Sequence, residues 1–262
     1  MNRIDKKFIQ LKNQNKKALI VFITAGYPDL STTAKLVMQL EKNGVDIIEL
    51  GVPFSDPLAD GPIIQEASRC SLKRKTNLAK ILVLVKQLRK HTDLPICLMT
   101  YYNPVFRFGE KSFVDKAKVC GVDGVIIPDL PIGEAKEFRH YANQKGLASI
   151  CFIAPTSSRI RIKGIVKAAR GFIYYVSSTG VTGSRKRLDV DLKAKLAEIK
   201  KLTTKPVCVG FGISNARQVR EVSKISDGVI IGSAIVAKIK ENLGKRNLVQ
   251  RVGSFVERLS NV

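Results

Sequence analysis

Short runs of hydrophobic residues recur along the whole chain, and segments with helical periodicity separate them. Eight runs stand out: ALIVFITAG (18–26), DIIELG (46–51), LPICLMTYY (94–102), DGVIIPDL (123–130), ASICFIA (148–154), GFIYYVSS (171–178), KPVCVGFG (205–212) and DGVIIGSA (227–234). They lack the apolar–polar alternation of half-exposed strands, which is typical of strands covered on both faces. The pattern therefore predicts a parallel sheet of eight buried strands.

The segments between these runs predict helices. In NLAKILVLVKQLRK, from Asn77, apolar residues recur three and four positions apart and the last turn is basic, as the helix dipole favours. STTAKLVMQLEKNG (31–44) and VDLKAKLAEIKKL (190–202) are similar. Strand–helix units of about 33 residues, repeated eight times without a break in composition, predict a closed (β/α)8 TIM barrel. We expect one domain over residues 1–262. A doubly wound open sheet is disfavoured because TAGYPDLS, and no glycine-rich turn, follows the first strand.

The N-terminus predicts a short amphipathic helix, because Ile4, Phe8 and Leu11 recur at helical spacing. The apolar run that follows ends at Gly26 without a small-residue cleavage pattern, so it is interpreted as a strand and not as a signal peptide. Hydrophobic residues make up 45% of the chain, yet no run reaches the length of a membrane helix. We expect a soluble, cytoplasmic protein.

Cysteine usage and charge narrow the possible functions. The five cysteines are odd in number, widely spaced and without a CxxC pair, which favours reduced core residues over disulfides or a zinc site. They are Cys70, Cys97, Cys120, Cys151 and Cys208. The formal charge is +23, but the basic residues are spread along helices and aromatic residues do not alternate with them. A solvated basic surface that attracts phosphorylated substrates is favoured over nucleic-acid binding.

In a barrel of this type the chemistry is carried by the ends of strands and the loops that follow them. Glu49 falls at the predicted barrel mouth, where desolvation would raise its pKa into the range useful for proton transfer, although pairing with a lysine is an alternative. Asp60 closes the Pro-bounded loop after it, so the pair can act on one substrate. Asp56 lies in a Ser-Asp-Pro turn and is interpreted as structural or interfacial.

Small residues after the last three strands predict a phosphate site. GFGIS (210–214) and GSA (232–234) place glycines where backbone N–H groups can approach an anion, and STGVTG (178–183) can close over it. Turn geometry alone is the alternative reading for any one of these glycines. His91 and His140 lie away from the strand ends, which argues against a histidine-bound metal or a histidine triad. The residues thus indicate carboxylate acid–base chemistry on a phosphorylated substrate, without a cofactor or metal.

Several of these segments together resemble the α subunits of tryptophan synthases. They are FITAGYPD (22–29), ELGVPFSDPLADGP (49–62), TYYNPVF (100–106), PDLP (128–131), APTSS (154–158), YYVSSTGVTG (174–183), GFGIS and GSAIV (232–236). The resemblance runs from about Phe8 to Val256. It implies a lyase that cleaves indole-3-glycerol phosphate into indole and glyceraldehyde 3-phosphate, with Glu49 as the acid–base group and Asp60 at the indole N–H.

The same resemblance implies further site residues. Phe22, Tyr101 and Tyr174 match the pocket around the indole and glycerol parts of the substrate, and Thr182 matches a lid residue that orders the aspartate. The phosphate positions match Gly183, Phe211, Gly212, Gly232 and Ser233. Thr100 departs from the bulkier apolar residues common at its position.

The resemblance also implies a partner, a pyridoxal phosphate-dependent β subunit in an α2β2 complex, contacted through Pro53 and Asp56. The cofactor is expected only on that partner. Another phosphosugar barrel, such as an epimerase or isomerase, is the alternative enzyme. It would be expected to show a histidine cluster or a different acid–base pair.

Overall fold

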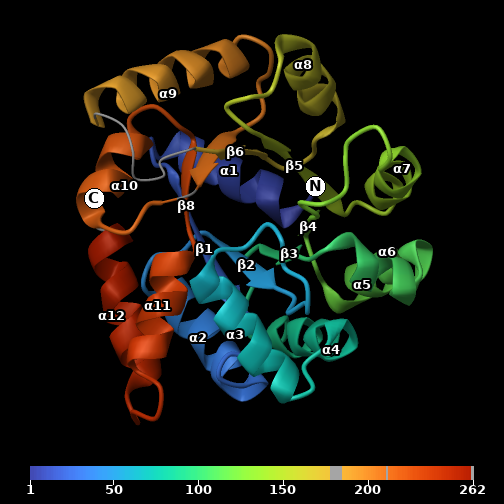
Figure 1. Ribbon diagram of the computed structural model, residues 1–262, viewed down its shortest axis with the longest axis vertical. Coiled ribbons are helices and arrows are strands. Elements are labelled where there is room, and N and C mark those ends of the chain that lie inside the picture. Colours follow the sequence, from blue (N-terminus) through green and yellow to red (C-terminus); the bar gives the residue numbers. More distant parts are fainter. Residues whose placement is uncertain (178–184, 211, 261–262) are drawn as a thin grey trace.

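The computed structural model describes residues 1–177, 185–210 and 212–260. Its strands form a closed parallel barrel in which each strand pairs with the next and β8 pairs with β1 (Figure 1). The strands are β1 (Ala18–Thr24), β2 (Ile47–Gly51), β3 (Ile96–Met99), β4 (Gly124–Ile126), β5 (Ala148–Ile153), β6 (Ile173–Val176), β7 (Val207–Gly210) and β8 (Gly228–Ile231). The predicted (β/α)8 barrel is confirmed.

Helices form the outer layer around this barrel (Figure 1). They are α1 (Arg3–Asn13), α2 (Leu30–Lys42), α3 (Pro62–Lys73), α4 (Leu78–Leu88), α5 (Tyr102–Phe108), α6 (Glu110–Cys120), α7 (Lys136–Gln144), α8 (Arg159–Ala168), α9 (Arg185–Lys200), α10 (Ala216–Ser223), α11 (Ser233–Glu241) and α12 (Leu248–Ser260). Two helices, not one, follow each of β2, β3 and β8, which the simple repeat in the sequence did not predict. Among the described residues, no helix has both the length and the apolar character needed to cross a bilayer.

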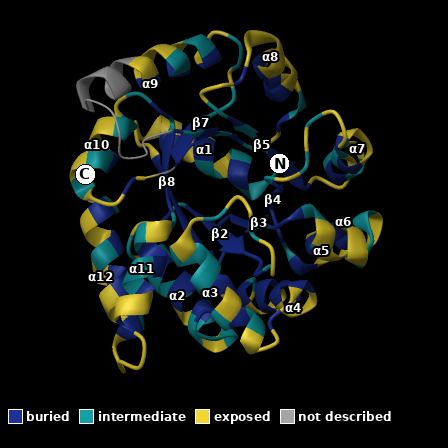
Figure 2. Cartoon of the chain, in the orientation of Figure 1, coloured by how far each residue is buried: buried dark blue, intermediate teal, exposed yellow. Residues whose placement is uncertain are grey.

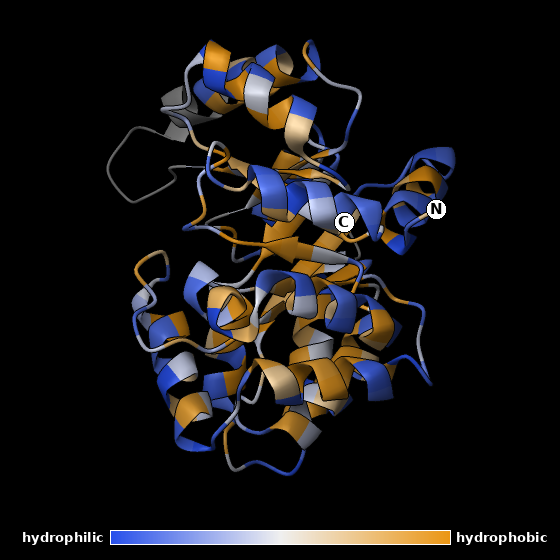
Figure 3. Ribbon diagram, turned by 90° about the vertical axis from the view of Figure 1, so that its right-hand side faces the viewer, coloured by the Kyte–Doolittle hydropathy of each residue, from blue (hydrophilic) through white to orange (hydrophobic). Residues whose placement is uncertain are grey.

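The core has an inner and an outer layer because successive strand residues face opposite sides of the sheet. Ile20, Ile47 and Ile126 belong to the cluster inside the barrel, and Val21 and Ile48 belong to the cluster under the helices. Every residue of β1 and β2 is buried. Figure 2 shows this burial at the strands and the inner helix faces, and Figure 3 shows hydrophobic residues concentrated there. All five cysteines are free, and Cys97, Cys120 and Cys208 are buried.

Aspartates that precede β2, β4 and β8 stabilise the lower end of the barrel, where the strands begin. Asp46 accepts a hydrogen bond from the Leu19 N–H at 3.0 Å, and Asp227 accepts one from Val207 at 2.9 Å. Asp123 accepts from the Ile96 N–H at 2.9 Å and forms a buried ion pair of 2.6 Å with Arg89. Each aspartate thereby satisfies a backbone donor on a neighbouring strand.

Helix α1 closes the lower end of the barrel, as its predicted amphipathic face suggested. Asn2 caps the helix by accepting from the Ile4 N–H at 2.9 Å, and its amide donates to the Asp123 carbonyl at 2.7 Å. Ile4, Phe8 and Leu11 are all buried in the inner cluster. Gly124 on β4 leaves space for this packing, because a Cβ there would lie 3.0 Å from Ile4 Cδ1.

Truncation of this plug should destabilise the fold. Ile4→Ala removes a fully buried side chain and is expected to lower the free energy of unfolding by about 2 to 5 kcal/mol. Ile9→Ala, in the same helix but 48% exposed, is the matched control and should cost far less. Urea unfolding of both variants measures the difference. Equal losses would show that α1 does not plug the barrel.

Candidate active site

Glu49 is a carboxylate enclosed by the barrel. It lies on β2, paired in register with Phe22 on β1 and Cys97 on β3, and it faces inward like Ile47 two residues earlier. Its exposed fraction is 0%, and neither carboxylate oxygen has a hydrogen-bond partner in the described part of the chain. Burial alone raises the pKa of Glu49 to about 8. The alternative of a lysine partner is therefore not seen among these residues.

Asp60 is held by a tyrosine from the next strand end. The Tyr101 hydroxyl donates to Asp60 Oδ2 at 3.1 Å, and the same hydroxyl accepts from the Ala59 N–H at 2.9 Å. Gln65 Nε2 donates to the Asp60 carbonyl at 2.9 Å, which fixes the loop where α3 begins. Burial raises the pKa of Asp60, and the hydrogen bond from Tyr101 opposes this effect.

Aromatic rings connect the two carboxylates. Burial raises the pKa of Tyr174 on β6, and the charges of Glu49 and Asp60 both add to this rise, so the phenol lies within electrostatic reach of each. Its ring packs on Phe152 of β5 with centroids 4.7 Å apart. The Phe54 and Tyr101 rings stack at 5.2 Å on the side of the Asp60 loop. The strand ends near both carboxylates therefore carry two pairs of packed aromatic rings.

Two glycines make room for these rings. A Cβ on Gly210 would lie 2.6 Å from the Tyr174 hydroxyl oxygen. A Cβ on Gly51 would lie 2.6 Å from Cε2 of Phe22. Real side chains do not approach this closely, so glycine is required if both rings are to reach into the barrel.

The opposite side of the mouth offers backbone donors. Gly232 is the N-cap residue of α11 without a side-chain cap, and Ser233 is the first residue of that helix, so its first N–H groups are available to an anion. Gly212 has φ +75°, a conformation that favours glycine. Thr182, Gly183 and Phe211 lie outside the described residues, and Phe22 packs about 3.4 Å from the position of a Gly232 Cβ.

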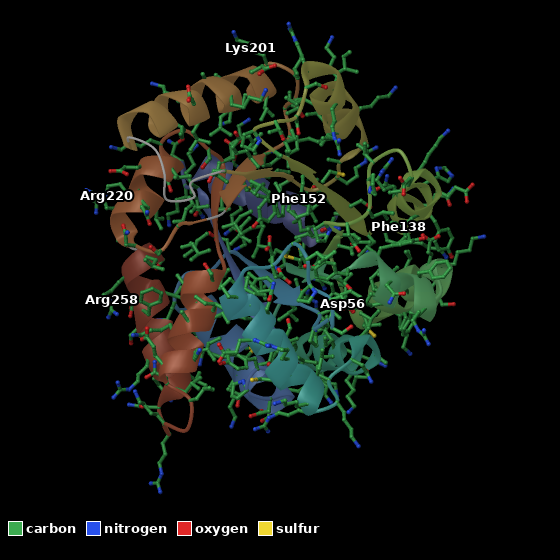
Figure 4. The ribbon with its side chains drawn as sticks, viewed as in Figure 1. Asp56, Phe138, Phe152, Lys201, Arg220 and Arg258 are labelled. Atoms are coloured by element: carbon green, nitrogen blue, oxygen red, sulfur yellow. The ribbon has the colours of Figure 1, made fainter. Side chains whose placement is uncertain are left out.

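The rim beside Asp60 exposes apolar side chains. Asp56, labelled in Figure 4, is exposed and accepts a hydrogen bond of 2.5 Å from the Ser55 hydroxyl. Pro53 is buried beneath the same loop. Leu58 is 94% exposed, and Phe106 on the adjacent α5 is 64% exposed. The surface of this rim therefore comes from Asp56, Leu58 and Phe106, and not from Pro53.

Several site features were not predicted from the sequence. The role of Tyr101 in holding Asp60, the two space-making glycines and the position of Phe152 all depend on contacts between different strands. Thr24, at the end of β1, also carries a buried hydroxyl that has no partner among the described residues. The only indication of these residues in the sequence was that they lie in or next to the predicted strand ends. Thr100 is buried, and its hydroxyl donates to the Tyr101 carbonyl at 3.1 Å.

A metal centre finds no support in the described residues, where no cluster of three or more His, Cys, Asp or Glu side chains is suited to bind one. His91, just beyond α4, and His140 on α7 are both exposed.

Comparisons with known proteins identify the family of this chain. Residues 8–262 match the family model described as tryptophan synthase alpha chain. The tryptophan synthase alpha chain of Geotalea uraniireducens (strain Rf4) is 49% identical over 259 residues, 99% of this chain and 97% of that one. The crystal structure of tryptophan synthase subunit alpha from Legionella pneumophila str. Paris covers 100% of this chain and 98% of its own, with a TM-score of 0.93 and 37% identity. This chain belongs to the tryptophan synthase alpha chain family.

Proposed function

We propose that Glu49 and Asp60 together catalyse the retro-aldol cleavage of indole-3-glycerol phosphate into indole and glyceraldehyde 3-phosphate. By its family the chain is a carbon–carbon lyase of tryptophan biosynthesis. The observation that carries the residue assignment is Glu49, a fully buried carboxylate that faces the barrel interior and has no hydrogen-bond partner among the described residues. Such a group is costly to the fold and is retained where it handles protons.

Glu49 serves as the acid and then as the base. A pKa of about 8 keeps its carboxyl protonated at neutral pH, ready to donate a proton to C3 of the indole ring. The carboxylate that results takes the proton from the hydroxyl on the adjacent glycerol carbon. That oxygen then becomes the aldehyde oxygen, the bond between C3 and the glycerol carbon breaks, and its electrons return to the indole ring.

Asp60 acts on the other side of the ring. Protonation at C3 makes the indole nitrogen positive, and a carboxylate that accepts its N–H stabilises this intermediate. The hydrogen bond from Tyr101 favours the ionised form of Asp60, which suits an acceptor. The two carboxylates thus have different roles because their surroundings differ. This chemistry calls on no cofactor in this chain.

The remaining predicted residues are assigned to substrate binding. Phe22, Tyr101 and Tyr174 form the apolar wall for the indole, and Gly212, Gly232 and Ser233 receive the phosphate. The uncapped start of α11 supports the phosphate assignment. Thr182, Gly183 and Phe211 are proposed to complete the closure and the phosphate site.

The rim formed by Asp56, Leu58 and Phe106 is proposed to contact a tryptophan synthase β subunit in an α2β2 assembly. Side chains as exposed as Leu58 and Phe106, from two adjacent strand-end segments, are better explained by a protein contact than by packing within the chain. Pro53 supports the loop from below.

The burial of Glu49 should make stability depend on pH. Between pH 4.5 and about 8 the unfolded chain releases the Glu49 proton while the folded chain retains it, so the free energy of unfolding falls as pH rises. Glu49→Gln removes this loss. The variant should therefore gain stability relative to the parent between about pH 5 and pH 9, measured by urea unfolding. If the difference in the free energy of unfolding between the variant and the parent stayed constant across this range, it would contradict a raised pKa of Glu49.

Asp60→Asn should leave the fold intact and lower turnover by about 10² or more, because the neutral amide cannot stabilise the positive indole nitrogen. Release of indole from indole-3-glycerol phosphate measures the effect. Asp93→Asn, at an aspartate whose side chain is 92% exposed, is the control for a loss of charge. If the variant kept more than about a tenth of the turnover of the parent, Asp60 would have only a structural role.

Phe106→Asp should weaken binding to a tryptophan synthase β subunit by about tenfold or more, because it places a charge in an apolar contact. Val119→Asp is the matched control. Val119 is 72% exposed near the end of α6, which leads away from the rim. Isothermal titration calorimetry with the β subunit compares the two, and equal affinities would place the contact elsewhere.

A further inference from the structure

A cavity of ≈ 220 Å³ lies between β4, β5, the loop after β4 and helices α7 and α8. Most of its wall is apolar and includes Val125, Ile127, Phe138 and Ile165. Phe138 and Phe152, both lining residues, are labelled in Figure 4. An apolar cavity of about 150 Å³ is large enough to bind benzene, so this one has space for a ring and a small substituent.

The wall contains polar groups of β5, one of which has no hydrogen-bond partner among the described residues. Ser149 is 4% exposed, and its hydroxyl has no hydrogen-bond partner among the described residues. Cys151, two residues along the strand, also lines the cavity. A buried hydroxyl without a partner costs stability, which a ligand or a water that bonds to it would recover.

Positive charge gathers at the same cavity. Arg139 from α7 and Arg161 from α8 both line it, and within the described part of the chain neither side chain forms a hydrogen bond or an ion pair. The charge of Arg139 is close enough to Cys151 to oppose the rise that burial causes in the pKa of that thiol. Two unpaired guanidinium groups beside an apolar cavity are suited to a carboxylate.

Helix α7 adds to this field. Ala135, the N-cap residue of α7, lines the cavity and has no side chain able to cap the helix. The positive end of the α7 dipole therefore lies at the same wall as Arg139. Arg161 lies in the first turn of α8, where the N-cap residue Ser158 already accepts a hydrogen bond from its N–H.

One acidic residue opposes this arrangement. Asp129 also lines the cavity, but it is exposed, and its Oδ1 already accepts a hydrogen bond of 2.8 Å from the Tyr102 N–H. With two arginines and one aspartate, the lining carries a net positive charge, which favours binding of an anion.

We propose that this cavity binds a small monocarboxylate whose apolar part is about the size of one aromatic ring. The carboxylate is bound by Arg139 and Arg161, and the ring is enclosed by the apolar residues of β4, α7 and α8. Neither Glu49 nor Asp60 lines this cavity, but Phe152, which does, also packs on Tyr174.

Benzoate is the probe for this site, titrated into the ¹⁵N-labelled full chain while amide resonances are followed. Saturable shifts at millimolar benzoate are expected at Ser149, Cys151 and Phe138. Benzamide has the same shape without the charge and should bind about tenfold more weakly. Arg139→Gln should weaken benzoate binding by a similar factor. Arg258→Gln changes an exposed arginine on α12, far from Phe138 in Figure 4, and should bind like the parent.

Ala135→Leu tests the cavity independently of charge, because the larger side chain occupies the space. It should abolish the shifts while the melting temperature and indole release show that the chain is folded. If this variant fails to fold, Arg139→Gln decides alone. No saturable shift, equal binding of benzamide and benzoate, or binding unchanged by Arg139→Gln would each overturn the proposal.

Discussion

The site depends on one constraint, which is that a closed parallel barrel has no spare hydrogen-bonding groups to offer a carboxylate inside it. The backbone N–H and C=O groups of β1, β2 and β3 are used in the ladders between strands. The inward side chains below Glu49 are apolar, Ile20 and Ile47 among them. Glu49 is therefore shielded from bulk solvent and has no hydrogen-bond partner among the described residues, so a raised pKa that keeps it protonated avoids a buried charge. The strain that this residue places on the fold and its capacity as an acid have the same origin.

Asp60, the second carboxylate, is also partly buried, but its pKa is subject to an opposing hydrogen bond that Glu49 lacks. Asp60 comes from a loop and not from a strand, so it can meet the Tyr101 hydroxyl, which also accepts from the Ala59 N–H. A hydrogen bond to the ionised form counteracts partial burial, whereas nothing counteracts burial at Glu49. One carboxylate on a strand and one on a tethered loop have different surroundings, which is what the proposed roles of an acid and of an ionised hydrogen-bond acceptor require.

The sequence predicted the repeating parts of this structure better than the contacts between them. Buried strands were predictable because their apolar runs are continuous, and Glu49 stood out because a charge interrupts one of them. The short helix α5 was missed because it has only seven residues and ends at Phe108, too short for a helical period to be recognised. The Tyr101 contact with Asp60 joins residues 41 positions apart, and the space that Gly51 leaves for Phe22 joins adjacent strands. Neither relationship has a local signature, so only the closed barrel brings them together.

The large positive charge acts together with a neutral phosphate site. The groups proposed to receive the phosphate, at Gly212, Gly232 and Ser233, are backbone donors and a hydroxyl, and none carries a formal charge. Their interaction with an anion is short in range, because a helix terminus acts over about one turn. An excess of 23 positive charges acts over longer distances and raises the concentration of a doubly negative substrate near the surface. On the proposed assignment, attraction by the whole surface and binding by neutral dipoles are separate functions, and the phosphorylated product would leave these groups without breaking an ion pair to them.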